Sequence, residues 1–271
     1  MFNKLGYQTL KATEGSSESL ARTIENISNI KSLGYKRNQT SFVETLNGEI
    51  TRHESKDFSQ GPLRRTGEVF DLALDGQGFF EIELENGQRA YTRAGHFRLN
   101  GEGELVTADE GYKVVPLVED VGKPIIEVKK DKNNVLGLNM EVTTPKLIIP
   151  PDLTPEITEN GTVNGINPVN GEKRKIGRVN VVAFNNPQGL ELIGKGLYVP
   201  TKLSGQVQEI EYGPNVSTKV KQGYLEYGNV DIAREMMDMT QIKNLISAQF
   251  KVLKVLDKLY EQVNYTIGKS V

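Results

Sequence analysis

The chain has 271 residues and no cysteine, which excludes disulfide bonds, thiolate zinc sites and cysteine nucleophiles. Its 33 Lys and Arg nearly balance 35 Asp and Glu, so no overall field favours binding to nucleic acid or to an anionic membrane. Hydrophobic residues make up 37%, which is low for one compact globule of this length and suggests that part of the chain lacks a core of its own.

Neither a cleaved secretory signal nor a membrane span is predicted. Lys4 is not followed by an apolar run of the length that a signal peptide requires. No later stretch approaches the roughly 20 apolar residues that cross a bilayer. We therefore expect a soluble chain without membrane insertion, which stays in the cytoplasm or leaves it without a cleaved signal.

The first zone, residues 1–36, predicts a weak helix that ends near Ser32. Its apolar face is sparse, and Gly6, Gly15 and many Ser and Thr residues dilute it. Isolated helices of this quality are marginal in water, so we expect a partner helix to stabilise it. Gly34 is suited to the left-handed residue that follows a helix. The apolar face comprises Leu5, Leu10, Leu20, Ile24 and Ile27.

Two zones follow, a connector and a β domain. Residues 37–66 are polar and nearly without periodicity, and they predict an extended connector. Residues 67–222 have the pattern of an antiparallel β domain, which is either a sandwich or a barrel. Within it, residues 121–155 predict a hairpin excursion on the surface. The predicted turns are Asp75-Gly76, Asn86-Gly87, Asn100-Gly101, Asn160-Gly161 and Asn170-Gly171.

The last zone, residues 223–271, carries the clearest pattern. Residues 232–266 contain no glycine or proline, and bulky residues recur at alternating spacings of three and four, which is a heptad seam. Asn229 or Asp231 can cap the start of this helix, and Gly268 ends it. The seam comprises Met239, Ile242, Ile246, Gln249, Leu253, Leu256, Tyr260 and Val263.

Two roles are open for this seam. By pattern alone, an amphipathic helix more often packs on the core of its own chain. A helix of about 35 residues, however, spans roughly 50 Å, which is more than one small domain can cover. The second role is a coiled-coil-like stalk formed with residues 1–36 and with other copies of the chain. Gln249 in the seam would lower stability but fix the register.

Sequence motifs give more than periodicity does. Residues 67–80 have the sequence GEVFDLALDGQGFF, and residues 91–97 have the sequence YTRAGHF. Both resemble the signature of the bacterial flagellar hook and rod family. Near the N-terminus, where family members carry an asparagine-rich run ending in Thr-Gly-Phe-Lys, this chain keeps Asn29, Gly34, an aromatic residue and Lys36. Further matches lie at residues 105–107, 111–114, 148–151, 160–163, 184–190, 194–198 and 222–230.

The resemblance implies an α+β fold, in which the N- and C-terminal helices form a stalk and the central antiparallel β domain lies outside it. It implies a non-enzymatic subunit of the flagellar basal-body rod, which polymerises into a helical tube and transmits torque from motor to hook. The implied partners are copies of the chain, other rod and hook proteins, and the flagellar type III export machinery. The implied location is the periplasm-spanning rod. Pro150-Pro151 and residues 185–190 favour the distal rod type, whereas residues 57–67 resemble the proximal type.

The implied assembly interface lies on the terminal helices. Its hydrophobic residues would be covered when neighbouring subunits pack in a helical lattice, because such a heterologous contact does not close on itself. It comprises Leu20, Ile24, Ile27, Asn29, Gly34, Lys36, Met239, Ile242, Ile246, Gln249, Leu253, Leu256, Tyr260 and Val263.

Catalytic, metal and cofactor sites are not predicted. Asp71 and Asp75 are spaced along one strand and do not converge as an acid and base pair would. The Gly76–Gly78 turn precedes a strand, unlike a phosphate loop, and His53 and His96 lack a second histidine at ligand spacing. Two rival hypotheses are a cell-wall or carbohydrate-binding β module with a coiled-coil tail, and a peptidoglycan hydrolase. The first predicts aromatic platforms, yet the chain has no Trp.

Overall fold

The computed structural model describes residues 2–44, 50–117, 146–210 and 218–268, and most of the hairpin excursion predicted at 121–155 lies outside them. The chain divides into two compact units. The helical unit comprises residues 1–31, 36–57 and 229–271, and the β unit comprises residues 32–35 and 58–228. The predicted α+β fold class is confirmed.

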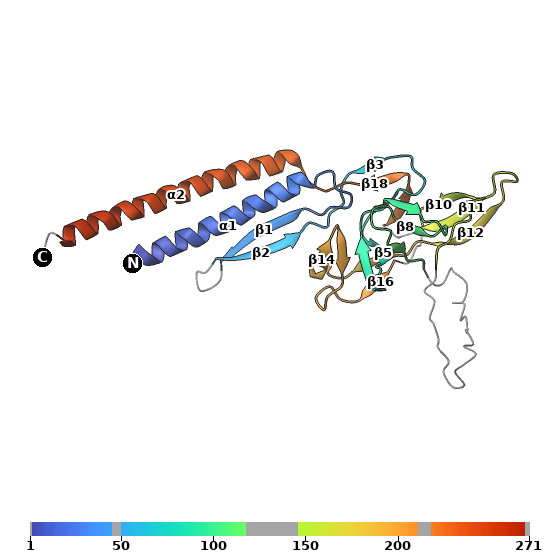
Figure 1. Ribbon diagram of the computed structural model, residues 1–271, viewed down its shortest axis with the longest axis horizontal. Coiled ribbons are helices and arrows are strands. Elements are labelled where there is room, and N and C mark those ends of the chain that lie inside the picture. Colours follow the sequence, from blue (N-terminus) through green and yellow to red (C-terminus); the bar gives the residue numbers. More distant parts are fainter. Residues whose placement is uncertain (1, 45–49, 118–145, 211–217, 269–271) are drawn as a thin grey trace, which may run out of the picture. The chain divides into compact units, whose positions relative to one another are not determined.

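The helical unit contains two long helices and one hairpin. Helix α1 spans Phe2–Ser28 and helix α2 spans Ile232–Gly268. The helices run antiparallel, because Ser16 bonds to Gln249 while Asn26, further along α1, bonds to the earlier Glu235. Figure 1 accordingly shows the start of α1 (blue) on the same side as the end of α2 (red).

A hairpin occupies the segment predicted to be an extended connector. Strand β1 (Asn38–Glu44) pairs antiparallel with β2 (Ile50–Lys56), with Asn38 opposite Lys56. The polar sequence hides these strands, because a two-stranded ribbon is held by backbone hydrogen bonds and needs no alternating apolar face.

The β unit is built from short strands, and every ladder among its described residues is antiparallel, as predicted. The largest sheet has the order β14-β15-β6-β5-β9-β8-β7, and β13 adds to it by pairing with β5 and β16. A three-stranded sheet, β10-β11-β12, and the pairs β17-β4 and β18-β3 complete the unit. The strands are β3 (Leu63–Arg65), β4 (Leu72–Asp75), β5 (Phe79–Glu83), β6 (Arg89–Thr92), β7 (Phe97–Leu99), β8 (Leu105–Thr107), β9 (Lys113–Val114), β10 (Thr154–Ile157), β11 (Thr162–Ile166), β12 (Lys173–Arg178), β13 (Val181–Phe184), β14 (Glu191–Gly194), β15 (Leu197–Val199), β16 (Val207–Glu209), β17 (Lys219–Gln222) and β18 (Tyr224–Glu226), with a short 3-10 helix at Pro187–Gly189.

Strand β5 separates two hydrophobic cores. Phe80 and Ile82 point into the larger core, whereas Phe79 points into a smaller aromatic one, because successive side chains of a strand alternate between its faces. In the aromatic core, Tyr91 and Phe184 meet edge to face with centroids 5.0 Å apart. Such pairs add to the burial of apolar area. Packing on both faces explains why two consecutive residues of β5, Phe79 and Phe80, are both large and apolar.

Turn geometry follows the predicted Asn-Gly pairs with one difference. Gly87 and Gly161 have φ values of 78° and 75°, which only glycine adopts without strain. In the turn after Asn100, the positive φ falls on Gly103 instead of Gly101. The Asn100 side chain explains the change, because its Oδ1 accepts the amides of Glu102 and Glu104 and widens the turn.

Candidate assembly interface

The heptad seam of α2 is the least exposed face of that helix. Leu256 is only 6% exposed, and the other seam positions from Met239 to Tyr260 are half-buried, while their neighbours, apart from the half-buried Asp238, are exposed. Val263, the last predicted position, is 45% exposed. The seam therefore packs within its own chain along α1, up to Tyr260.

The buried face of α1 differs from the predicted one. Leu5, Leu10 and Ile24 are about half exposed, at 47%, 50% and 48%, while Leu20 and Ile27 are half-buried. The face that is buried instead carries small polar residues at helical spacing. These residues are Thr13, Ser16, Ser19, Thr23 and Asn26.

The hydroxyl groups of this face donate their hydrogen bonds to backbone carbonyls of α1 itself. Thr13 donates to the carbonyl of Thr9 at 2.9 Å, and Ser16 donates to that of Ala12 at 2.9 Å. Ser19 and Thr23 bond in the same way to carbonyls four residues earlier. A hydroxyl that already has a partner is buried at little cost. The helical spacing of these Ser and Thr residues is visible in the sequence. It does not identify a buried face, because buried faces are recognised by apolar side chains, which these positions lack.

Gln249 explains how a polar residue fits the seam. Its Nε2 donates to Ser16 Oγ at 3.1 Å, while Ser16 in turn donates to its own helix. The Gln249 Oε1 atom is buried and has no hydrogen-bond partner among the described residues. Thr13 and Ser19 present further hydroxyl groups one turn away on the same face, so this contact stabilises the helix pair but does not by itself select its register.

A polar clamp joins α1, β1 and α2; it consists of Asn26, Arg37, Asn38 and Glu235. Glu235 is 1% exposed, and its carboxylate accepts hydrogen bonds from the Arg37 guanidinium and, at 3.1 Å, from Asn26 Nδ2. Asn26 Oδ1 accepts the backbone amide of Asn38 at 2.9 Å. Both buried charges therefore have partners, as burial requires. No pattern in the sequence indicated this clamp.

Of the two residues predicted to cap the start of α2, Asp231 does so and Asn229 does not. Asp231 Oδ1 accepts the amide of Ala233 at 2.9 Å, which is the N-cap interaction. Asn229 instead bridges two strand ends, because it accepts the amide of Arg37 at 2.7 Å and donates to the carbonyl of Asp57 at 2.8 Å.

The remaining predicted residues of α1 and its exit lie apart from the seam. Asn29 Nδ2 donates to the carbonyl of Glu25 at 2.9 Å and finishes α1. Lys36 is 1% exposed. Gly34 belongs to the β unit, where it has a φ of 64° and donates its amide to the carbonyl of Glu226 at 2.8 Å. A Cβ atom on Gly34 would lie 2.5 Å from the backbone nitrogen of Ala94, so glycine is required there.

The motif at residues 91–97 holds a structural ion pair. Arg93 Nε donates to Glu226 Oε2 at 2.8 Å, and both side chains are nearly fully buried. Arg93 Nη1 also donates to the carbonyls of Gly76 and Gly78, and Glu226 Oε1 accepts the amide of Gly61. The pair ties strand β18 to the turn between β4 and β5. Its polar atoms are engaged in these bonds, which is the arrangement of a support and not of a reactive group.

Asp71 and Asp75, considered above as an acid and base pair, are each bound elsewhere. Asp71 lies 2.7 Å from His96 Nδ1, and Asp75 lies 2.6 Å from Lys221 Nζ. The Lys221 hydrogen bond lowers the pKa of Asp75. Among the described residues, no group of three or more His, Cys, Asp or Glu side chains could hold a metal ion.

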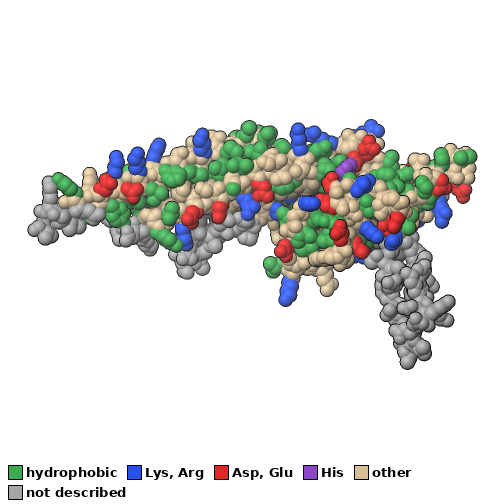
Figure 2. Space-filling view, viewed as in Figure 1, with side chains coloured by type: hydrophobic (Ala, Val, Ile, Leu, Met, Phe, Trp, Pro, Cys, Tyr) green, Lys and Arg blue, Asp and Glu red, His purple; other side chains and the backbone are tan. Residues whose placement is uncertain are grey.

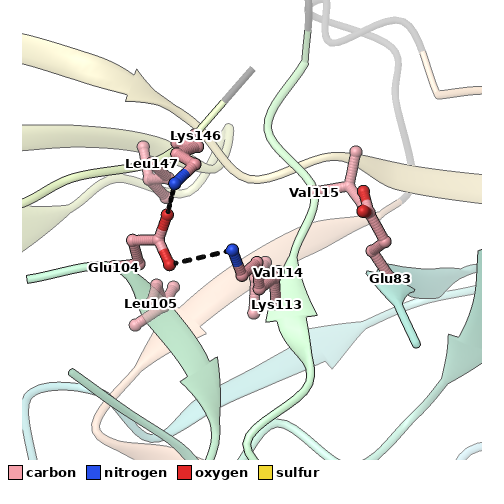
Figure 3. Close-up of a pocket in the computed structure, with 8 residues that line it drawn as sticks. All are labelled: Glu83, Glu104, Leu105, Lys113, Val114, Val115, Lys146 and Leu147. Carbon is pink, nitrogen blue, oxygen red and sulfur yellow. Dashed lines mark ion pairs between the residues drawn. The ribbon is translucent and has the colours of Figure 1, made fainter. Parts of the chain in front are cut away.

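Glu104 lies at a small cavity of the β unit (Figure 3). Its carboxylate is 2.8 Å from Lys146 Nζ and 3.3 Å from Lys113 Nζ. Burial opposes ionisation, but hydrogen bonds from Lys146, Asn100 and Lys113 outweigh it and lower the pKa of Glu104. The cavity measures about 10 Å³, which is the space of one water molecule. It is too small for a substrate.

Over the described residues, no helix is both long and apolar enough to span a membrane.

Known proteins resemble this chain at both the domain and the whole-chain level. Residues 73–165 match the flagellar hook protein FlgE/F/G D1 domain, and residues 221–265 match the flagellar basal body rod FlgEFG protein C-terminal domain. The FlgG basal-body rod protein of Buchnera aphidicola from Schizaphis graminum is 28% identical over 97% of this chain and 84% of its own.

Two further relatives and one solved structure extend the comparison. FlgG of Bacillus subtilis is 28% identical over 88% of this chain and 89% of its own, and FlgF of Caulobacter vibrioides is 26% identical over 87% and 85%. The Helicobacter pylori flagellar hook protein FlgE2 covers 70% of this chain and 43% of its own, with 15% identity and a TM-score of 0.24, which is too low to support an argument. The two family domains lie in the order and at the positions that the motifs predict. The chain therefore belongs to the flagellar hook and basal-body rod family.

Proposed function

We propose that this chain is a structural subunit of the bacterial flagellar basal-body rod, which polymerises with copies of itself into a tube and transmits torque from motor to hook. The family match carries the proposal, because relatives named basal-body rod proteins align with 86% to 97% of the chain. The family is structural, and the buried charges of the β unit fit that role. The alternative of a carbohydrate-binding module has no support in these matches.

The helical unit supports the polymerising role. A chain that stays monomeric seldom leaves a row of large apolar side chains in water. Here α2 leaves many of them exposed after packing on α1. Among them are Leu245, Phe250, Val252, Val255, Leu259 and Val263, which are 39% to 58% exposed. Assembly would remove this surface from water and supply the driving force.

Three finer features belong to the same proposal. The similarity to FlgG relatives favours the distal rod type over the proximal type. Partners would be other rod and hook proteins at the two ends of the tube. Export through the flagellar type III machinery without a cleaved signal, and a place in the periplasm-spanning rod, follow from the same assignment.

Substitution in the seam tests the role of the helix pair. Replacing Leu253 and Leu256 with aspartate should abolish polymerisation and swimming while the β unit stays folded, because buried carboxylates without partners separate α2 from α1. Electron microscopy of the purified chain and motility in soft agar are the readouts. Lys243→Glu, at an exposed position of α2, is the control and should behave as the wild type. Normal filaments from the double variant would contradict the proposal.

A further inference from the structure

Helix α2 carries a second apolar row beside its seam, which we name the outer α2 stripe. Each member directly precedes a seam residue, and all of them are exposed. The large members are exposed by 39% to 57%. The outer α2 stripe comprises Leu245, Ala248, Val252, Val255 and Leu259. It has the same alternating spacing as the seam and is therefore a second helix-packing surface.

Helix α1 carries a matching row, which we name the outer α1 stripe. Each member directly follows a residue of the buried or half-buried face, and all are exposed. Between two large apolar side chains, Leu10 and Ile24, the row holds Glu14 and the small residues Ser17 and Ala21, and the small residues permit close approach of another helix. The outer α1 stripe comprises Leu10, Ser17, Ala21 and Ile24.

The two stripes lie on opposite sides of the helix pair. One residue turns an α-helix by about 100°. On α1 each stripe residue comes one position after a residue of the buried face, so the stripe is turned from that face in one sense. On α2 each stripe residue comes one position before a seam residue, so the stripe is turned from the seam in the other sense. Because the helices are antiparallel, these opposite rotations face opposite directions. Both stripes also have the same length, about 21 Å for residues 10–24 and for residues 245–259.

The two stripes differ in charge, because the border of the outer α2 stripe is basic whereas the outer α1 stripe has one acidic residue, Glu14, within it and a mixed border. The row beyond the outer α2 stripe is basic, with Lys251, Lys254 and Lys258 all exposed. Figure 2 shows basic side chains gathered along this edge of α2. The outer α1 stripe is interrupted by the exposed Glu14, and the row beside it carries Lys11, Glu18, Arg22 and Glu25, of which Arg22 and Glu25 pair with each other at 3.1 Å. Contact between the α2 stripes of two copies would instead bring two lysine rows together.

We infer that the outer α2 stripe of one subunit docks on the outer α1 stripe of the next copy. The inference rests on the proposed function and names the surfaces that carry it. Since the two stripes face opposite ways, each subunit adds one partner on either side. Such a heterologous contact continues without closing after two chains, as a polymer requires.

Two complementary variants test this pairing. Ile24→Asp disables the outer α1 stripe and Val255→Asp disables the outer α2 stripe, so each should raise the critical concentration for polymerisation at least about tenfold. Mixed in equal amounts, the two variants should form a heterodimer, because each retains the stripe that the other has lost. Analytical ultracentrifugation of each variant and of the mixture measures this. Circular dichroism should show unchanged helix content.

The outcomes separate this inference from the proposed function. If the wild type polymerises and Val255→Asp polymerises equally well, only the stripe pairing fails. The stripe pairing would also be overturned if the Ile24→Asp variant formed dimers with itself and the further substitution Val255→Asp in the same chain abolished them. That result would show contact between the α2 helices of two copies. A wild-type chain that stays monomeric at every concentration would count against both. As a second readout, Lys254→Glu with Lys258→Glu should weaken assembly, and Glu14→Lys in the partner should restore part of it.

Discussion

Several charged side chains of the β unit, among them Arg93, Glu226 and Glu104, are buried where they hold neighbouring strands together. Arg93 and Glu226 join the turn between β4 and β5 to β18, and Glu104 draws Lys113 and Lys146 together. By contrast, the Asp75 and Lys221 pair is about 40% exposed on both sides, so solvent screens it and its contribution is small. A buried charge such as that of Glu226 or Glu104 matters more, because removal of its partner leaves it uncompensated.

Replacing Glu104 with glutamine should change how stability depends on pH. The pKa of Glu104 is lowered in the folded state, so its ionised form stabilises the fold above the unfolded pKa. That contribution is lost as the pH falls through the lower, folded pKa. Glu104→Gln should therefore cost about 1 kcal/mol at pH 7 and lose less stability on acidification. Urea unfolding at a series of pH values measures both effects.

Glu102 supplies the matched control for this experiment. Its side chain is 72% exposed and lies 3.9 Å from Lys146, so Glu102→Gln should leave both the stability and its pH dependence nearly unchanged. Equal acid sensitivity of Glu104→Gln and the wild type would mean that Glu104 is not the group responsible.

At the scale of elements, the sequence indicated α2 better than α1. The seam of α2 is apolar, so its period is visible in the sequence and its positions are those that the structure buries up to Tyr260. The buried face of α1 is made of hydroxyl groups that bond to their own helix, so hydrophobicity alone points to the wrong side. The clamp around Glu235 depends on residues from three elements, and no local pattern indicates it.

The stability of the helix pair should depend on Ser16. In Ser16→Ala, the Gln249 amide loses its partner, which costs about 1 kcal/mol and should speed hydrogen exchange of the paired α1 and α2 amides about fivefold. The double variant Ser16→Ala with Gln249→Leu should recover the protection, because the buried amide is then absent. Hydrogen exchange with mass spectrometry measures it. Ser17→Ala changes an exposed neighbour and should have no effect.

The whole molecule combines two units of different construction. The β unit has hydrophobic cores on both faces of β5, whereas the helical unit depends on one seam, one polar clamp and a hairpin. The antiparallel β domain was predictable from its turns and alternating runs. The division of the chain was less predictable, because residues 32–35 join the β unit although they lie within the predicted first zone, residues 1–36.

Limited proteolysis should distinguish the two units in dilute solution. Cuts within residues 2–31 and 232–268 should precede cuts within residues 72–114, because fewer buried apolar contacts oppose local opening in the helical unit. Mass spectrometry of the fragments over time measures the order. First cuts inside strands β4 to β9 would contradict this ranking of stability.

The hydroxyl face of α1 has a mechanical consequence. Its hydrogen bonds stay within α1, so α2 can shift a short way along or around that face without breaking them. The Gln249 contact and the clamp at Glu235 oppose such a shift with polar bonds. We therefore expect the two helices to slide or rotate slightly against each other when the subunit is twisted, and to return to their original packing when the twist is released.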